Sequence, residues 1–320
     1  MAITVSNQGP DPQSLAPVPG LPASRFAPGK RLMSFVLPLA VSVFVLLAPL
    51  HAQSRNFFWK ATGRGGVVYL AGSVHMLSQD FYPLNPAIET AFRESDLLVE
   101  EVDMAEMLGA GSQLNVLTRG MLPGDSTLQK VVSPATYALV TKTVTGLGLP
   151  IEPLARFKPW MLALTLEGLQ LMKVGFDPEL GLDKHFYDLA QTGGKPVQGL
   201  ETTDYQISRF DEMTMDQQDR LLAETLKALE TEQASVGKLT QSWKAGDVAA
   251  VEKILLADLR NDPQLYQRLL VERNRNWLPK LEALFARSRP AFVVVGAAHL
   301  VGPDGVVAML KAKGYSVEQR

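Results

Sequence analysis

Two copies of one local pattern, far apart in the chain, constrain the fold most strongly. Residues 67–75 and 292–299 each run from a β-favouring segment into Gly-x-x-His. Glycine permits a sharp change of direction at the end of a strand. The histidine is then delivered to the carboxyl edge of the sheet, where open α/β sheets place their ligands. If the two strands are neighbours, the imidazoles of His75 and His299 converge there. The pattern predicts one sheet built from both ends of the chain.

A mostly helical middle region, approximately residues 133–288, separates these sheet-forming ends. Residues 57–62 and 67–71, joined by a glycine-rich turn, predict a β-hairpin. The fold expected is therefore α/β, with a central mixed β-sheet formed from N- and C-terminal segments and with the helical region covering a cleft. Further strands are expected at 97–99, 195–200, 291–295 and 315–318, and helices over 85–93, within 133–189 and 216–286, and over 306–313.

The first 52 residues differ in composition from the rest. Residues 1–30 are rich in proline and lack a periodic apolar pattern, which predicts a disordered leader. Residues 31–52 begin with a basic residue, continue through an uncharged apolar run at 32–50 and end in small and polar residues, an order typical of a secretory signal peptide. An uncleaved membrane anchor through 32–50 and a buried core helix are the alternatives. With a signal peptide the body, residues 53–320, is periplasmic or secreted. With an anchor it is held at the inner membrane and faces the periplasm.

Composition excludes several classes of function. Lys and Arg number 31 against 33 Asp and Glu, a formal charge of −2, which excludes a strongly basic nucleic-acid binder. There is no cysteine, so thiolate metal sites, redox motifs and disulfides are impossible. The motifs of zincins, of Gly-x-Ser-x-Gly hydrolases and of P-loop nucleotide-binding proteins are also absent. Any metal must be bound by His, Asp, Glu or backbone oxygen.

The two motif histidines and one carboxylate form a candidate metal site. Successive side chains of a strand point to opposite faces, so only one of Glu100 and Glu101 is expected to face the cleft. A His/His/Glu set suits Mn²⁺, Co²⁺ or Zn²⁺, and such an ion lowers the pKa of bound water from ~15.7 to about 7. The alternative is that each Gly-x-x-His is an ordinary strand-to-loop turn whose histidine is simply hydrogen-bonded.

Five motifs in order make the chain resemble a known family. They are Gly-Ser-Val-His at 72–75, Glu-Val-Asp at 101–103, Gly-Leu-Asp at 181–183, Gly-Leu-Glu-Thr at 199–202, and Gly-Ala-Ala-His-Leu at 296–300 with Gly302 and Gly305 beyond it. Over roughly residues 55–318 the chain resembles the TraB/GumN family, which is related to the Tiki metalloproteases and more distantly to erythromycin esterase and ChaN-like proteins. The resemblance implies an α/β fold whose motifs line one cleft, and a divalent-metal-dependent hydrolase or peptidase activity.

The resemblance also implies roles for particular residues. His75 and His299 are the motif histidines, Glu101 is the acid of the Glu-x-Asp motif, and Glu201 is the acid of Gly-Leu-Glu-Thr. We expect His75, Glu101 and His299 to bind the metal, and Glu101 to take part in catalysis as well. Glu201 is the next candidate for a ligand or general base.

A late helix supplies the last two candidates for catalysis. Arg273 and Asn274 resemble the family's Arg-Asn pair, although the repeated dipeptide at 275–276 leaves the register open. An arginine beside the metal could hold a substrate carboxylate or stabilise an oxyanion, and the asparagine could hydrogen-bond a ligand or the substrate. The alternative for this stretch is a solvated, arginine-rich helix face.

Two further polar residues have structural alternatives. Asp183 falls near the start of a helix, where an acid ordinarily caps the helix or complements its dipole. His185 lies beside an apolar helical stripe and is expected to pack there. The function expected is an extracytoplasmic metal-dependent hydrolase, peptidase-like, acting on a peptide or small polar substrate. The alternative is a non-catalytic periplasmic binding or regulatory protein for a peptide or polysaccharide.

Overall fold

The computed structural model describes residues 56–320, apart from the side chains of residues 230–235 and 258. The predicted leader and the predicted signal peptide or anchor lie outside the described residues. Within residues 56–320, no helix is both long enough and apolar enough to cross a bilayer.

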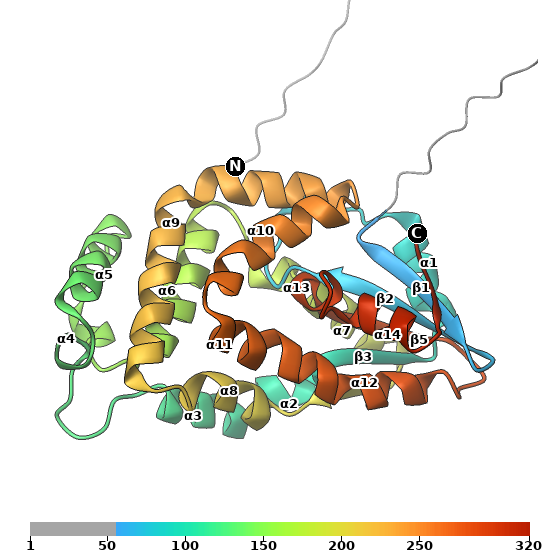
Figure 1. Cartoon of the computed structure of the whole chain (residues 1–320), viewed down its shortest axis with the longest axis horizontal. Coiled ribbons are helices and arrows are strands. Elements are labelled where there is room, and N and C mark those ends of the chain that lie inside the picture. The colour runs from blue at the N-terminus through green and yellow to red at the C-terminus, as the bar shows by residue number, and fades with distance from the viewer. Residues whose placement is uncertain (1–55) are drawn as a thin grey trace, which may run out of the picture. The chain divides into compact units, whose positions relative to one another are not determined.

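A six-stranded mixed sheet organises the described chain, in the order β4-β3-β5-β2-β1-β6 (Figure 1). The four strands β4, β3, β5 and β2 are parallel, whereas β1 pairs antiparallel with both β2 and β6. The predicted fold class is therefore confirmed, since strands from both ends of the chain lie side by side. The strands are β1 Phe58–Gly63, β2 Gly66–Ser73, β3 Leu97–Val102, β4 Val197–Glu201, β5 Ala291–Gly296 and β6 Ser316–Gln319.

The predicted hairpin is β1 and β2. Its two turn residues, Arg64 and Gly65, have positive φ angles of 50° and 85°. That left-handed backbone matches the twist of antiparallel strands, and it is why glycine is used here.

Strand β5 occupies the centre of the sheet, and all six of its residues are buried. Parallel strands buried on both faces are uninterrupted apolar runs, and residues 291–295 form such a run. The register pairs Ser73 of β2 with Gly296 of β5, so the two Gly-x-x-His segments leave the sheet at neighbouring points on the same edge. Strand β3 lies on the other side of β5 and brings its terminal glutamates to that edge.

Helices cover both faces of the sheet. Behind the strands in Figure 1, α7 packs on β5, and Phe92 of α1 and Phe186 of α7 meet Phe292 with ring centroids 5.5 and 4.6 Å away. In front lie α12 and α14, and α13 follows β5 directly. These helices are α1 Pro86–Glu94, α7 Leu182–Gly193, α12 Glu272–Leu284, α13 Ala297–Leu300 and α14 Val306–Ala312.

A second apolar core lies among α4, α5, α6 and the 30-residue helix α9. Leu162, Leu166, Leu222 and Leu226 are fully buried in it. We call this group of four helices the helical lobe. The remaining helices connect the lobe to the sheet. In chain order the lobe and its connecting helices are α2 Met104–Leu108, α3 Ala110–Arg119, α4 Leu128–Val131, α5 Pro134–Gly146, α6 Pro159–Lys173, α8 Thr203–Asp211, α9 Met215–Lys244, α10 Val248–Asn261 and α11 Pro263–Tyr266. Short 3-10 turns lie at Gln79–Phe81, Glu152–Leu154 and Pro178–Leu180, and a π-helical turn at Gln267–Val271.

Candidate active site

The two Gly-x-x-His segments meet around Gly296, at the carboxyl end of β5. A Cβ atom placed on Gly296 would lie 3.1 Å from Glu101 Oε1, 3.5 Å from His75 Nε2 and 3.6 Å from His299 Cδ2. Three residues that are distant in sequence therefore surround one small space. Any side chain at position 296 would fill it, which explains the glycine there.

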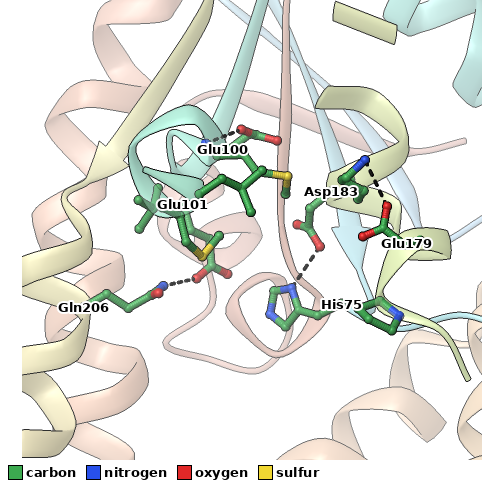
Figure 2. A pocket seen from close by; sticks show the side chains of 12 residues that line it. His75, Glu100, Glu101, Glu179, Asp183 and Gln206 are labelled. Carbon is green, nitrogen blue, oxygen red and sulfur yellow. Dashed lines mark hydrogen bonds and ion pairs between the residues drawn. The ribbon is translucent and has the colours of Figure 1, made fainter. Parts of the chain in front are cut away.

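His75 is the exposed member of the group, with 66% of its side chain accessible. Its Nδ1 lies 2.9 Å from Asp183 Oδ2, and the Ser73 hydroxyl donates to the same oxygen at 2.5 Å (Figure 2). The Asp183 carboxylate raises the pKa of this imidazole above its usual value. A proton on Nδ1 is thereby held toward Asp183, and Nε2 is left facing the space beside Gly296.

His299 is buried, and both of its ring nitrogens are engaged. Nδ1 donates to Asn274 Oδ1 at 2.6 Å, and Asn274 in turn donates to the backbone oxygen of Asp304 at 2.9 Å. Nε2 accepts from Arg273 Nη1 at 3.0 Å. Burial and the Arg273 charge lower the pKa of His299 to about 3, so this ring is neutral at physiological pH.

Glu101 is held by three donors. The Gly296 amide donates to Oε1 at 2.7 Å, while Gln206 and Arg273 donate to Oε2 at 3.0 and 2.5 Å. Burial alone would raise the pKa of Glu101, but Arg273, the two histidines and the Gly296 amide together outweigh burial and hold the pKa below its usual range. The carboxylate is therefore ionised across the physiological pH range.

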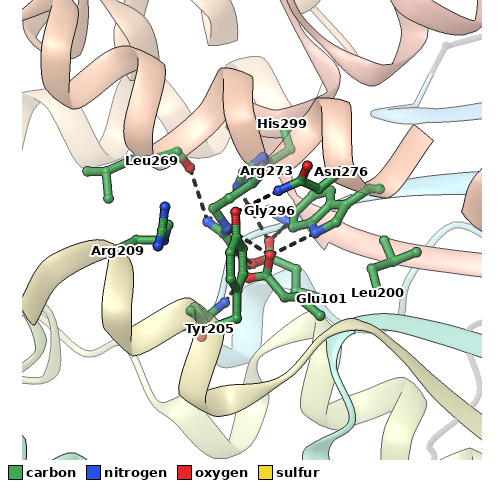
Figure 3. Close-up of polar contacts among 12 residues, drawn as sticks. Glu101, Leu200, Tyr205, Arg209, Leu269, Arg273, Asn276, Gly296 and His299 are labelled. Atoms are coloured by element: carbon green, nitrogen blue, oxygen red, sulfur yellow. Dashed lines mark hydrogen bonds and ion pairs between the residues drawn. The ribbon is translucent and has the colours of Figure 1, made fainter. Parts of the chain in front are cut away.

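Arg273 links the acids at the back of the site. Its Nη2 donates to Glu201 Oε1 at 2.7 Å as well as to Glu101, and Trp277 donates to Glu201 Oε2 at 2.8 Å (Figure 3). Glu101 and Glu201 thus share the Arg273 guanidinium, whereas Asp183 pairs with His75, so three carboxylates stand against one guanidinium and one imidazole. Residual negative charge remains, which favours a bound cation.

Glu100 departs from the expectation that only one of the two neighbouring glutamates faces the cleft. A cavity of about 330 Å³ at this edge is lined by both Glu100 and Glu101, together with Val102 and Met104. The expectation was wrong because the cavity wraps around the end of β3. Residues from both faces of the strand reach it there.

The register of the repeated Arg-Asn dipeptide is now defined. Arg273 and Asn274 are buried in the site, whereas Arg275 and Asn276 are exposed, and Asn276 donates to the Tyr205 hydroxyl at 2.7 Å. The helix therefore turns the first pair toward the interior and the second toward solvent.

Some contributors to the site were not among the predicted site residues. Asp183 had been weighed chiefly as a helix cap, and Ser73 lies inside the first Gly-x-x-His motif without having been assigned a role. Gln206 and Trp277 carry no sequence signal that would have marked them. His185 lies 3.1 Å from Glu89 and packs against Phe186, away from this group.

The fold and site define an α/β protein with two strand-terminal histidines and a buried Arg–Glu network at one sheet edge. The chain belongs to the TraB/PrgY/gumN family, which matches residues 57–319. It is 26% identical over 243 residues to the uncharacterized protein YbaP of Escherichia coli (strain K12), covering 76% of this chain and 87% of that protein. An uncharacterized protein of Treponema pallidum (strain Nichols) is 22% identical over 283 residues, covering 83% of each. No solved structure matches the chain.

Proposed function

We propose that this protein is a divalent-metal-dependent hydrolase, peptidase-like, whose active site is the group around Gly296. The observation that carries the proposal is that His75 Nε2 and Glu101 Oε1 both lie within 3.5 Å of the position that a Cβ atom on Gly296 would occupy. The His299 ring lies beside them. Imidazole nitrogen and carboxylate oxygen are the donors that Mn²⁺, Co²⁺ and Zn²⁺ accept in proteins without cysteine.

The surroundings of His75 and Glu101 fit such an ion. Metal-binding histidines commonly donate their other ring N–H to a carboxylate, and His75 has this partner in Asp183. The three carboxylates of Glu101, Glu201 and Asp183 outnumber the two positive groups, Arg273 and His75, which also favours a cation.

His299 fits less completely, because its Nε2 already accepts from Arg273. Among residues 56–320 no three His, Asp or Glu side chains are placed to hold one metal ion together. The proposal therefore has His75 and Glu101 as the first ligands. His299 would complete the set if Nη1 of Arg273 released its Nε2.

The ion's contribution would be a bound water acidic enough to attack a carbonyl at neutral pH. The chain's own residues do the rest. Asp183 and Asn274 fix the orientations of His75 and His299, and Glu201 holds the guanidinium of Arg273 from behind. Arg273 is buried and its donors are engaged by protein groups, so it would act on a substrate oxygen through its positive charge beside the site, without a direct hydrogen bond. In this scheme Glu201 is a positioning residue, because Arg273 and Trp277 occupy its oxygens.

The proposed substrate is a peptide or a small polar compound, and the proposed location is outside the cytoplasm. The location rests on the sequence of residues 31–52 alone. A cleaved signal peptide would leave a mature protein that lacks the N-terminal segment. A membrane anchor through residues 32–50 would leave that segment in place. Mass determination of the protein recovered from cell fractions separates them.

Metal analysis of the purified protein is the direct test. We expect the wild type to bind Mn²⁺, Co²⁺ or Zn²⁺, and His75→Ala and His299→Ala to lose this binding while remaining folded. His185→Ala is the matched control and should bind metal as the wild type does, because His185 contacts Glu89 rather than the site. Absence of metal binding in the wild type, or unchanged metal content in both site variants, would overturn the proposal.

A second candidate is a non-catalytic protein that captures a peptide or polysaccharide. The contact between Arg273 and His299 favours it, since a guanidinium in this position provides counter-charge without a metal. Calorimetry with peptides and oligosaccharides, with and without chelator, separates the candidates. Binding that chelator leaves unchanged, with no cleavage, would establish the second.

A further inference from the structure

The cavity beside the site is lined by both charged and large apolar side chains. Its lining includes the polar side chains of His75, Glu101 and Asp183, which Figure 2 labels. It also includes the apolar side chains of Met104, Met107 and Leu108. Met107 and Leu108 are 37% and 50% exposed. Large apolar side chains left open to solvent next to reacting groups mark a binding surface more often than a structural one.

Glu100 is the most deeply buried of the acidic residues that line this cavity. It is only 2% exposed, and its Oε2 accepts from the Met104 amide at 3.2 Å. Its Oε1 has no hydrogen-bond partner among the described residues. A buried polar atom without a partner costs free energy, so a group that supplies the missing hydrogen bond gains affinity.

We propose that this cavity is the subsite for an apolar side chain of a peptide substrate, with Glu100 forming a hydrogen bond to the peptide backbone next to that side chain. Which peptide bond is cleaved next to this subsite rests on the proposed hydrolase function. Binding of the apolar side chain in the subsite does not. Glu100 is a specificity-determining residue in this scheme, and it takes no part in bond cleavage.

A peptide is the occupant that fits both halves of the cavity. Its side chain meets the methionines and Leu108, and its amide supplies a polar group for Glu100. Methionine is adaptable, so the wall can accommodate linear and branched chains alike. The volume of about 330 Å³ is at the lower end of ligand sites, which limits the occupant to one side chain and its adjoining backbone.

Binding is tested with blocked tripeptides, acetyl-Ala-X-Ala-amide, in which X is leucine, glycine or aspartate. Ligand-observed NMR on the full chain reports affinity and shows which protons contact the protein. We expect the leucine peptide to bind about tenfold more tightly than the glycine peptide, with saturation transfer strongest to the leucine methyl groups. The aspartate peptide should bind more weakly than either.

Two exposed leucines provide a matched pair of variants. Leu108→Asp should weaken binding of the leucine peptide about tenfold and abolish its preference over glycine. Leu117→Asp is the control. Leu117 is 47% exposed on α3 but does not line the cavity, so this variant should bind as the wild type does.

Variants of Glu100 separate a recognition role from a structural one. Glu100→Leu should weaken binding of the leucine peptide, because the backbone hydrogen bond is lost, and Glu100→Gln should restore part of it. Thermal unfolding measured in parallel shows that each variant is folded. Equal affinity in wild type, Leu and Gln forms would show that Glu100 has no part in recognition.

The outcomes also distinguish this inference from the proposed function. Preferential binding of the leucine peptide without cleavage would support the subsite and contradict the hydrolase. Cleavage of all three peptides at equal rates, with equal affinities, would support the hydrolase and overturn the subsite. Failure of every peptide to bind would overturn the subsite as well.

Discussion

At the scale of single residues, the charge of Arg273 is expected to have a large effect on the stability of the fold. Its guanidinium is almost completely buried and pairs with both Glu101 and Glu201, at 2.5 and 2.7 Å. For the three charged side chains together, the cost of removing them from water nearly cancels the attraction between them. Removing the guanidinium alone leaves two buried carboxylates without a counter-charge. Arg273 therefore supports the fold as well as the proposed chemistry.

Replacing Arg273 should be strongly destabilising. We expect Arg273→Met to lower the free energy of unfolding by about 3–5 kcal/mol, measured by urea denaturation at pH 7. Arg275→Met is the control on the same helix and should change stability by less than about 0.5 kcal/mol, since Arg275 is exposed. Similar losses in the two variants would contradict the ion network described above.

Glu100 should make stability depend on pH in an unusual direction. The ordinary pKa of a glutamate is 4.5, whereas burial raises the pKa of Glu100 to about 8 in the folded chain. Between these values the folded state keeps a proton that the unfolded state has released, so this residue lowers stability as pH rises. Glu100→Gln removes the effect. We expect this variant to be more stable than the wild type by about 4 kcal/mol at pH 8, with the difference disappearing below pH 4.5. Urea denaturation across this range is the measurement, and a constant difference would contradict the assignment.

At the scale of elements, the carboxyl end of β5 forms one side of the candidate site. The space beside Gly296 is bounded by Glu101 and His75, and the glycine itself has φ −49°, which any residue can adopt. The requirement for glycine is therefore one of room, not of backbone conformation.

Gly296→Ala should separate folding from function. The new methyl group would lie 3.1 Å from Glu101 Oε1, so we expect modest destabilisation but at least a tenfold loss of metal affinity, measured by calorimetry. The control is Gly168→Ala in the middle of α6, where a Cβ meets nothing within 4 Å. That change should raise stability by about 0.5–1 kcal/mol and leave metal binding unaltered. Wild-type metal affinity in Gly296→Ala would argue that the ion binds elsewhere.

Much of the element pattern could be predicted from sequence, for reasons specific to each segment. The continuous apolar run of β5 and the hairpin turn at Arg64 and Gly65 are strong local signals. Helix α2 was not predicted, because its five residues depend on a capping hydrogen bond from the Ala105 amide to Asp103 and on packing against β3. Propensity over so short a stretch carries little information.

The candidate site, too, could be predicted from the sequence only in part. The repeated Gly-x-x-His motif pointed to His75 and His299, because a motif repeated after two β-favouring segments can be recognised from the sequence alone. The partners that orient them come from elements whose spacing to the motifs is set by the tertiary fold. Neither the contact of Gln206 with Glu101 nor that of Trp277 with Glu201 could be read from any local pattern.

At the scale of the whole molecule, the described chain has two apolar cores, one on the sheet and one in the helical lobe. The long helix α9 belongs to the lobe at its first half, while Trp243 near its end donates to the backbone oxygen of Gly72 at 2.7 Å. A single helix thus connects the lobe to the strand that precedes His75.

The two cores should respond separately to mutation. Leu226→Ala, in the lobe, should cost about 2–5 kcal/mol locally and speed amide exchange in α5 and α6. The amides of β2 and β5 should keep their protection, as followed by hydrogen exchange and mass spectrometry. Leu70→Ala in β2 is the reciprocal variant and should expose the sheet first. Uniform loss of protection in both variants would indicate one cooperative unit.

The position of β5 has a consequence for the order in which this protein can be made. A ribosome synthesises β5, which belongs between β2 and β3 in the sheet, after both of these neighbours. Until residues 291–296 emerge, β2 and β3 have no partner between them, and the pair of histidines does not exist. A nascent polypeptide that has not yet reached residue 299 therefore lacks the candidate site, and so does any product that terminates before that residue.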